Sequence, residues 1–439
     1  LIGGVSQSRE ASLDEPVYRP TRFVRDPIDD WWSHVGYVAD PSSPEDVLPV
    51  GPGVLTRHAK PAHGPESHAT VFREDVDLAV SRLLDTTEAS LSQSCATPTI
   101  IQGPMAMIST SVDFASALNH ENVFPVFAFT GLQEAAIAHL AKEVLDRDDL
   151  GAFGVGIAGP LEMPAKAIQD CFDGAAPSVV LLSGDHWAER LVWKESTSGD
   201  VWLHVQHPAM VEQAWGEGFR HFVFEGCESG GHVGLLPATV LWPLALRSTA
   251  SLGGNTDDLH CVLAGGIHDA ESILFGLLLA RACGVGGQLS FMTGTRLLLT
   301  DEAVSSGALD ASYQQALAQC DLTRVIGKHG LGVRTAVQGD APVPTNGTLP
   351  AVYEAYGNAL KGQPSALWLT GECVAHCGSP TSLHDLTAAL LSYAERWRKI
   401  RSDALAIRRT VSVAQDAHQA VDLAIVGVGG IFPGAANVE

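Results

Sequence analysis

The sequence is poor in positive charge, with 27 Lys and Arg among 439 residues against 50 Asp and Glu, so its formal net charge is −23. Binding to nucleic acid or to an anionic membrane surface depends on clustered Lys and Arg, and we predict neither kind of partner. Charged residues of both signs make up only 18% of the chain and hydrophobic residues 46%, which is typical of a compact protein. The charge therefore excludes two classes of function but selects none.

The sequence also lacks the patterns of exported and membrane-spanning proteins. Its eight cysteines are scattered without a repeated paired spacing, which favours reduced thiols over a disulfide framework. No apolar run approaches the ~18 residues of a membrane span. No basic segment followed by an apolar one comes after Leu1, as a signal peptide would require. These absences predict a cytoplasmic protein.

Between about residues 96 and 300, short apolar runs alternate with helical patterns. The candidate strands are residues 99–102, 125–128, 152–157, 178–182, 201–205, 221–225, 260–264 and 285–291, and the helical patterns include 132–145, 209–217 and 271–282. Strands that alternate with helices imply a parallel sheet, and continuous apolar runs indicate strands buried on both faces. Eight such units in ~200 residues predict an α/β fold of the TIM (β/α)8 barrel type. An open doubly wound sheet is the alternative.

The regions outside the barrel differ from it in composition. We predict a loop-rich N-terminal extension at 1–95 with a short helix at 75–84, the barrel at 96–300, a helical region at 301–382, a linker at 383–420 and a separate segment at 421–439. A segment that follows the last strand can cover the barrel mouth, and we expect the region at 301–382 to do so. The linker begins with a charged helical pattern that runs from about residue 383 to 409.

Glycine-rich runs follow several of the predicted strands. The first strand is followed by Gly103-Pro104-Met105-Ala106, the sixth by Gly226-Cys227-Glu228-Ser229-Gly230-Gly231-His232-Val233-Gly234, the seventh by Gly265-Gly266-Ile267 and the eighth by Gly294-Thr295-Arg296. Barrel enzymes carry their active sites at these carboxyl ends, and backbone N–H groups after the last two strands frequently hold a phosphate. The alternative is that the glycines only form tight turns.

This combination of runs resembles the flavin-dependent nitronate monooxygenase (2-nitropropane dioxygenase) family, including its flavin-dependent enoyl-ACP reductase branch. The resemblance covers about residues 98–334, and the Glu-Gly-x-Glu-Ser-Gly-Gly-His-x-Gly run that begins at Glu225 is its most specific element. It implies a TIM barrel that binds FMN. By the family pattern, the phosphate would lie on Gly265, Gly266, Gly294 and Thr295, and the isoalloxazine near Gly103, Met105, Gly230 and Gly231.

The sequence departs from the family pattern in two places. The family usually has Ala-Gly-Gly after the first helix, where this chain has Asn119-His120-Glu121. The family also usually has an Asn after the third strand, where this chain has Gly156. The second departure removes a side chain that the resemblance places near the flavin.

His232 is the predicted catalytic residue. An imidazole with an ordinary pKa near ~6.5 can donate or accept a proton at neutral pH, and a positioned general acid or base contributes roughly 10²–10⁴ in rate. In an enoyl reductase the acid protonates Cα of the enoyl thioester while hydride is added at Cβ. In a nitronate oxidase the same group takes a proton from the nitroalkane carbon. The alternative is that His232 only binds loop backbone.

Several other clusters favour structural interpretations. The motif Cys373-x-x-His376-Cys377 has no second ligand pair at a matching distance, so we predict no metal site. Cys227 has no evident base to activate it. His204 and His207 flank the end of the fifth strand, where they either line the flavin pocket or bind nearby backbone.

Two further patterns lie near the ends of the sequence. His58, His63 and His68 fall in a Pro- and Gly-rich stretch, which indicates a solvated loop. The glycines from Gly427 to Gly430 fail the dinucleotide fingerprint, because its third glycine would fall on Phe432.

The segment at 421–439 resembles the first strand and turn of a type I polyketide synthase ketosynthase domain, on the run Ile-Val-Gly-x-Gly-x-x-Phe-Pro-Gly from Ile425 to Gly434. We therefore expect an FMN-dependent enoyl reductase-like domain of a polyketide or polyunsaturated fatty acid synthase. It would use NAD(P)H to reduce an acyl chain tethered to an acyl carrier protein. Its other expected partner is the ketosynthase of the same synthase. The sequence is compatible with a homodimer but does not predict one. The alternatives are a nitronate monooxygenase-like oxidase or acyl-chain desaturating domain, and a flavin-free structural or docking barrel.

Overall fold

A computed structural model describes the backbone of residues 22–26, 31–34, 36–40, 43–50, 98–130, 132–158, 165–172, 177–252, 258–285, 287–326, 333–336, 349–362 and 367–403. The chain divides into two compact units, Leu1–Tyr393 and Ala394–Glu439. No helix in these described ranges is long and apolar enough to cross a membrane. The helix expected at 75–84, the histidine-containing loop around His58–His68 and the segment at 421–439 lie outside the described residues.

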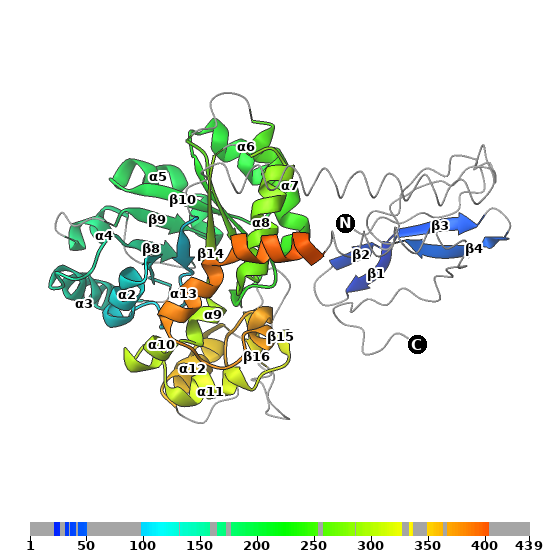
Figure 1. The fold of residues 1–439 in the computed structure, drawn as a ribbon. Helices are drawn as coiled ribbons and strands as arrows, with labels where there is room; N and C mark the ends of the chain where they lie inside the picture. Colours follow the sequence, from blue (N-terminus) through cyan, green and yellow to red (C-terminus); the bar gives the residue numbers. More distant parts are fainter. Residues whose placement is uncertain are drawn as a thin grey trace. The chain divides into compact units, whose positions relative to one another are not determined.

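The larger unit contains a parallel barrel (Figure 1). Its strands are β5 (Ile100–Gln102), β6 (Val123–Phe124), β7 (Val126–Ala128), β8 (Gly154–Ile157), β9 (Val179–Leu182), β10 (Asp200–Val205), β11 (His221–Glu225), β13 (His260–Ala264) and β14 (Gln288–Thr293). They pair in the order β6-β5-β14-β13-β11-β10-β9-β8-β7, and every pairing is parallel. Only Pro125 separates β6 from β7, and proline has no N–H to donate to a sheet. The nine strands therefore occupy eight positions, which confirms the predicted barrel.

Helices surround the barrel strands, as Figure 1 shows. They are α2 (Val112–His120), α3 (Glu134–Leu145), α4 (Ala165–Cys171), α5 (Arg190–Ser196), α6 (Ala209–Gly216), α7 (Ala238–Ala250) and α8 (Ala270–Ala282), with a 3-10 turn, η1, at Gly184–Trp187. Local signals set their starts: the Asp269 side chain accepts the N–H of Ser272 and forms a capping box at the start of α8. The predicted helices at 132–145, 209–217 and 271–282 match α3, α6 and α8 within two residues.

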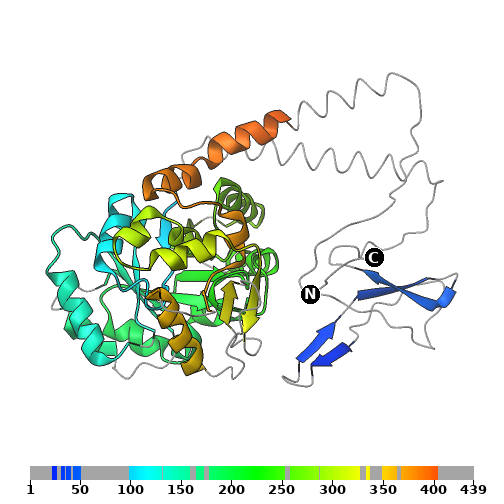
Figure 2. The same cartoon turned by 90° about the horizontal axis from the view of Figure 1, so that it is seen from below.

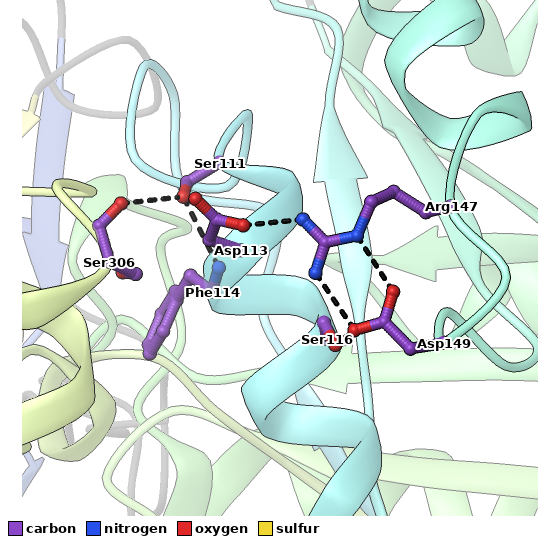
Figure 3. A network of polar contacts seen from close by, with 7 residues as sticks. All are labelled: Ser111, Asp113, Phe114, Ser116, Arg147, Asp149 and Ser306. Atoms are coloured by element: carbon purple, nitrogen blue, oxygen red, sulfur yellow. Dashed lines mark hydrogen bonds and ion pairs between the residues drawn. The ribbon is translucent and has the colours of Figure 1, made fainter.

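A polar network holds the start of α2 (Figure 3). The Ser111 hydroxyl donates to the Ser306 carbonyl oxygen at 3.3 Å, and the guanidinium of Arg147 binds the carboxylates of Asp113 and Asp149. The arginine holds the pKa of Asp149 well below its usual range. Exposed pairs of this kind contribute little stability.

The chain after the last barrel strand lies across one end of the barrel (Figures 1 and 2). It forms α9 (Thr295–Leu298), α10 (Asp301–Ser305), α11 (Ala311–Ala318), β15 (Thr323–Ile326), β16 (Val333–Ala336), α12 (Leu349–Leu360) and η2 (Glu372–His376). β16 pairs with β15 and also, antiparallel, with β12 (Gly231–His232), which belongs to the loop after β11. The helical prediction for 301–382 missed this three-stranded sheet, which joins the region to the glycine-rich loop.

The ends of the described chain differ from the sequence pattern in detail. In the N-terminal extension, β1 (Arg22–Asp26) pairs with β2 (Trp31–His34), and β3 (Gly36–Asp40) pairs with β4 (Ser43–Val50), both antiparallel. The helix expected at 383–409 is interrupted: α13 (Leu383–Leu391) ends before Ser392, and helical backbone resumes at 393–403.

Candidate active site

A cavity of about 190 Å³ lies at the carboxyl ends of the barrel strands. All eight predicted cofactor-binding residues line it: Gly103, Met105, Gly230, Gly231, Gly265, Gly266, Gly294 and Thr295. These residues come from the loops after four different strands, β5, β11, β13 and β14. The barrel thus brings together positions that are almost 200 residues apart in the sequence.

Gly265 and Gly266 illustrate why glycine is required on this wall. Both have positive φ, +90° and +84°, in the region that residues with a side chain rarely adopt. A Cβ on Gly265 would lie 2.8 Å from the backbone nitrogen of Gly226, whereas a Cβ on Gly266 would meet no atom within 4 Å. Gly265 therefore packs closely against the neighbouring loop, while Gly266 leaves space in front of its backbone.

The covering region is attached directly to the glycine-rich loop. The N–H of Glu372 donates to the carbonyl oxygen of Glu228 at 2.8 Å, and the N–H of Gly371 donates to Oγ1 of Thr295 at 2.7 Å. The residues Val333, Tyr356, Leu369, Thr370, Gly371 and Cys373 from this region line the cavity. Sequence reasoning missed all six, because no motif links them to the barrel.

For His232 the structure describes the backbone, which lies in β12 opposite Val333. Its role therefore stays a prediction. The other two histidines near the site differ in whether they line the cavity. His204 lines the cavity, with Nε2 2.8 Å from Oε2 of Glu225, whereas Nδ1 of His207 accepts the N–H of Ala209 at the start of α6.

Glu228 is a half-buried carboxylate in the cavity wall. Both of its oxygens accept the N–H of Ala238, at 3.0 and 2.8 Å, at the first residue of α7. Burial raises the pKa of Glu228 above its usual range. Nothing in the Glu-Ser-Gly-Gly sequence indicated this capping role, because the helix begins ten residues later.

The cysteines near the site are thiols. Burial raises the pKa of Cys227 to about 11, so it is uncharged at neutral pH. Sγ of Cys377 donates to the carbonyl oxygen of Cys373 at 3.1 Å, and both cysteines are buried. Within the described ranges, no group of three or more His, Cys, Asp or Glu side chains could hold a metal ion.

Two buried hydroxyls in the cavity wall suit a polar ligand. Oγ of Ser229 and Oγ1 of Thr370 are buried without a hydrogen-bond partner among the described residues, and both residues line the cavity. An unpaired buried hydroxyl costs about 1–3 kcal/mol, which a ligand that binds it would offset. FMN has a phosphate, ribityl hydroxyls and polar ring edges, so the residues present fit the group that the family resemblance implies.

The two departures from the family pattern have different consequences. Asn119 accepts the N–H of Gly151 at 2.7 Å and Glu121 contacts His384, and neither lines the cavity. Gly156 does line it, but a Cβ there would lie 2.5 Å from Cβ of Pro104. Pro104 therefore fills the space that a side chain at position 156 would need.

The fold matches solved structures at low sequence identity. FabK from Thermotoga maritima aligns with a TM-score of 0.56 and 21% identity, over 74% of this chain and 98% of that chain. A nitroalkane oxidase from Streptomyces ansochromogenes aligns with a TM-score of 0.50 and 18% identity, over 69% and 97%. No protein-family model and no curated protein matches the sequence. The comparisons show a shared barrel fold.

Proposed function

We propose that the chain is an FMN-dependent enoyl reductase-like domain. It reduces the enoyl thioester of an acyl chain carried by an acyl carrier protein, with NAD(P)H as the reductant, in a synthase that also contains a ketosynthase. The observation that carries the proposal is the single cavity lined by all eight residues that the family pattern assigns to FMN. The unpaired hydroxyls of Ser229 and Thr370 support a polar ligand in the same cavity.

Backbone groups would hold the cofactor, because the described cavity wall contains no Lys or Arg. The N–H groups of Gly265, Gly266, Gly294 and Thr295 are the candidates for the phosphate, as in other barrels. FMN bound there would supply hydride transfer, while the protein would orient the substrate and transfer the proton. A backbone cradle also explains how an acidic chain can bind an anionic cofactor.

The chain's own side chains would prepare the substrate. Met105, Leu298 and Leu369 line the cavity with apolar surface and exclude water from the reacting atoms. His232 is the expected donor of the proton to Cα. We expect His232→Ala to retain FMN and to lose turnover.

A nitroalkane oxidase is the second candidate function, because the fold is shared with a structure of that name. It requires the same cavity but the opposite proton movement, from the nitroalkane carbon to the protein. A flavin-free barrel is less well supported, because all eight residues that the family pattern assigns to FMN line one cavity.

The test is an anaerobic redox titration of the purified chain. We expect a yellow protein that NADPH bleaches and that crotonyl-pantetheine reoxidises, with only slow reoxidation by O₂. Fast O₂ consumption with a nitroalkane and without NADPH would instead support the oxidase. A colourless protein that takes up no FMN would contradict both enzyme functions.

A further inference from the structure

The carboxyl ends of β10 and β11 place a histidine beside a carboxylate in the cavity wall. Nε2 of His204 lies 2.8 Å from Oε2 of Glu225, and both residues line the cavity. The His204 residue is only 9% exposed, and the Glu225 side chain is 25% exposed. The pair is thus largely shielded from water but open to a ligand.

The strand register aims both side chains into the barrel. Side chains alternate along a strand, so His204 shares the face of Trp202 and Glu225 shares the face of Val223. Trp202 and Val223 both belong to the interior core of the barrel. Because β10 and β11 are paired along their length, rigid strands hold the two groups in place.

Stability alone is a weak reason for a pair of this kind to occur here. Buried ion pairs are often no more stabilising than apolar residues of similar volume. The neighbouring inward positions are apolar, as Val223, Val262 and Ala264 show. The inward positions directly next to the pair are therefore apolar, and a His–Glu pair among them at the open end of the barrel suits a chemical role.

The carboxylate suits the ring to act as a hydrogen-bond donor. A histidine ring that donates from both nitrogens carries a positive charge, and the carboxylate of Glu225 lies where it would balance that charge. Nε2 faces Glu225 at 2.8 Å without making a hydrogen bond to it, and the ring makes no other polar contact with the described residues. The second N–H is left for an acceptor in the cavity.

We propose that His204, held by Glu225, donates a hydrogen bond to the substrate oxygen on which negative charge develops. Under the proposed function, on which this inference rests, that oxygen is the thioester carbonyl of the enoyl chain. The proton stays on the ring nitrogen, so no covalent bond to His204 forms or breaks, and Cα is protonated by a separate donor. Glu225 is a positioning residue, because it acts through the ring. Preorganised donors of this type contribute about 10²–10³ in rate.

The test uses crotonyl-pantetheine labelled with ¹³C at the carbonyl and the FMN-loaded chain without NADPH, so that no reduction occurs. Isotope-edited infrared spectroscopy measures the carbonyl stretch of the bound probe. We expect a lower frequency than in solution for the wild type, the solution frequency for His204→Leu, and a smaller shift for Glu225→Gln. Turnover should fall about 10²–10³-fold in His204→Leu, with partial recovery in His204→Gln, whose amide still donates.

His207→Gln is the matched control, because His207 binds the start of α6 and does not line the cavity. It should keep the wild-type carbonyl frequency. If the wild type reduces the probe but His204→Leu changes neither frequency nor rate, the role of the pair is overturned while the proposed function stands. If the wild type reduces no enoyl thioester, the proposed function fails, and the carbonyl frequency still decides the pair: an unshifted carbonyl in the wild type overturns it.

Discussion

The two ends of the barrel each hold an inward-facing histidine, but in different surroundings. At the amino end, Nε2 of His260 lies 2.8 Å from the Ser290 hydroxyl, and its ring packs 5.0 Å from that of Trp202 and 5.7 Å from that of His221. At the carboxyl end, His204 contacts a carboxylate and lines a cavity. The first histidine is sealed among rings, and the second is open to a ligand.

The comparison shows that the group a histidine contacts, and how deeply it is buried, distinguish a structural role from a role in binding or catalysis. Burial, with a smaller effect of His221, lowers the pKa of His260 to about 4, so the ring is neutral at physiological pH. A neutral ring paired with a hydroxyl completes the barrel floor. A ring that lies beside a carboxylate and lines a cavity is placed to contact a bound ligand. The identity of the residue alone does not separate these roles.

The largest expected difference between the two ends is in turnover. His232→Ala at the mouth should lose about 10²-fold or more in kcat, because it would remove the proposed general acid, and should retain FMN. His260→Asn at the floor should leave kcat unchanged, because Asn can still bind Ser290. Steady-state kinetics and the flavin spectrum of both variants measure this. Equal losses of kcat in the two variants would contradict the assignment of a structural role to the histidine at the floor and a catalytic role to the histidine at the mouth.

The floor histidine should make stability depend on pH. The folded pKa of about 4 lies below the ordinary value of 6.5, so between these values the unfolded chain binds a proton that the folded chain does not. The contribution of His260 to the free energy of unfolding should therefore fall by up to about 3 kcal/mol as pH drops from 6.5 to 4, and this contribution should not change further below pH 4. Urea unfolding at several pH values measures it. His260→Asn should reduce the slope, to which His221 also contributes because burial lowers its pKa too, whereas His139→Asn, whose side chain is 74% exposed, should not change it.

At the mouth, Gly156→Asn should destabilise the chain by about 1–3 kcal/mol, because the new side chain overlaps Pro104. The double variant Pro104→Gly/Gly156→Asn should recover most of this loss. Thermal unfolding of the two variants and of Pro104→Gly alone provides the cycle. Additive effects would show that the two positions do not compete for the same space.

A smaller effect should come from the unpaired hydroxyl of Ser229. Ser229→Ala should leave the FMN-free chain as stable as the wild type or slightly more stable, since no hydrogen bond to a described residue is lost. Ser109→Ala is the control and should lose about 1 kcal/mol, because the Ser109 hydroxyl accepts the N–H of Met105 at 2.9 Å. Urea unfolding of both FMN-free variants separates the paired hydroxyl from the unpaired one.

The sequence predicts the barrel well because each unit carries a local signal. The observed strands at 221–225 and 260–264 agree with the predicted ranges to the residue, and the eight cavity residues follow strand ends. The covering segment from Leu369 to Cys373 could not be predicted, since its contacts with Glu228 and Thr295 join residues that are 76 or more positions apart. The compensation of Gly156 by Pro104 is likewise visible only in three dimensions.

The central claim is that the barrel mouth is an FMN site, and an FMN titration monitored by flavin fluorescence tests it most directly. The same titration of Gly266→Ala and Gly284→Ala tests whether FMN binds at the cavity wall. The two variants are matched, because both glycines have positive φ and open space around a new Cβ. Each variant should lose about 1–2 kcal/mol of stability. We predict one FMN per chain for the wild type and for Gly284→Ala, and affinity reduced about tenfold or more for Gly266→Ala, which lines the cavity. No FMN binding by the wild type, or equal affinity in all three proteins, would contradict the claim.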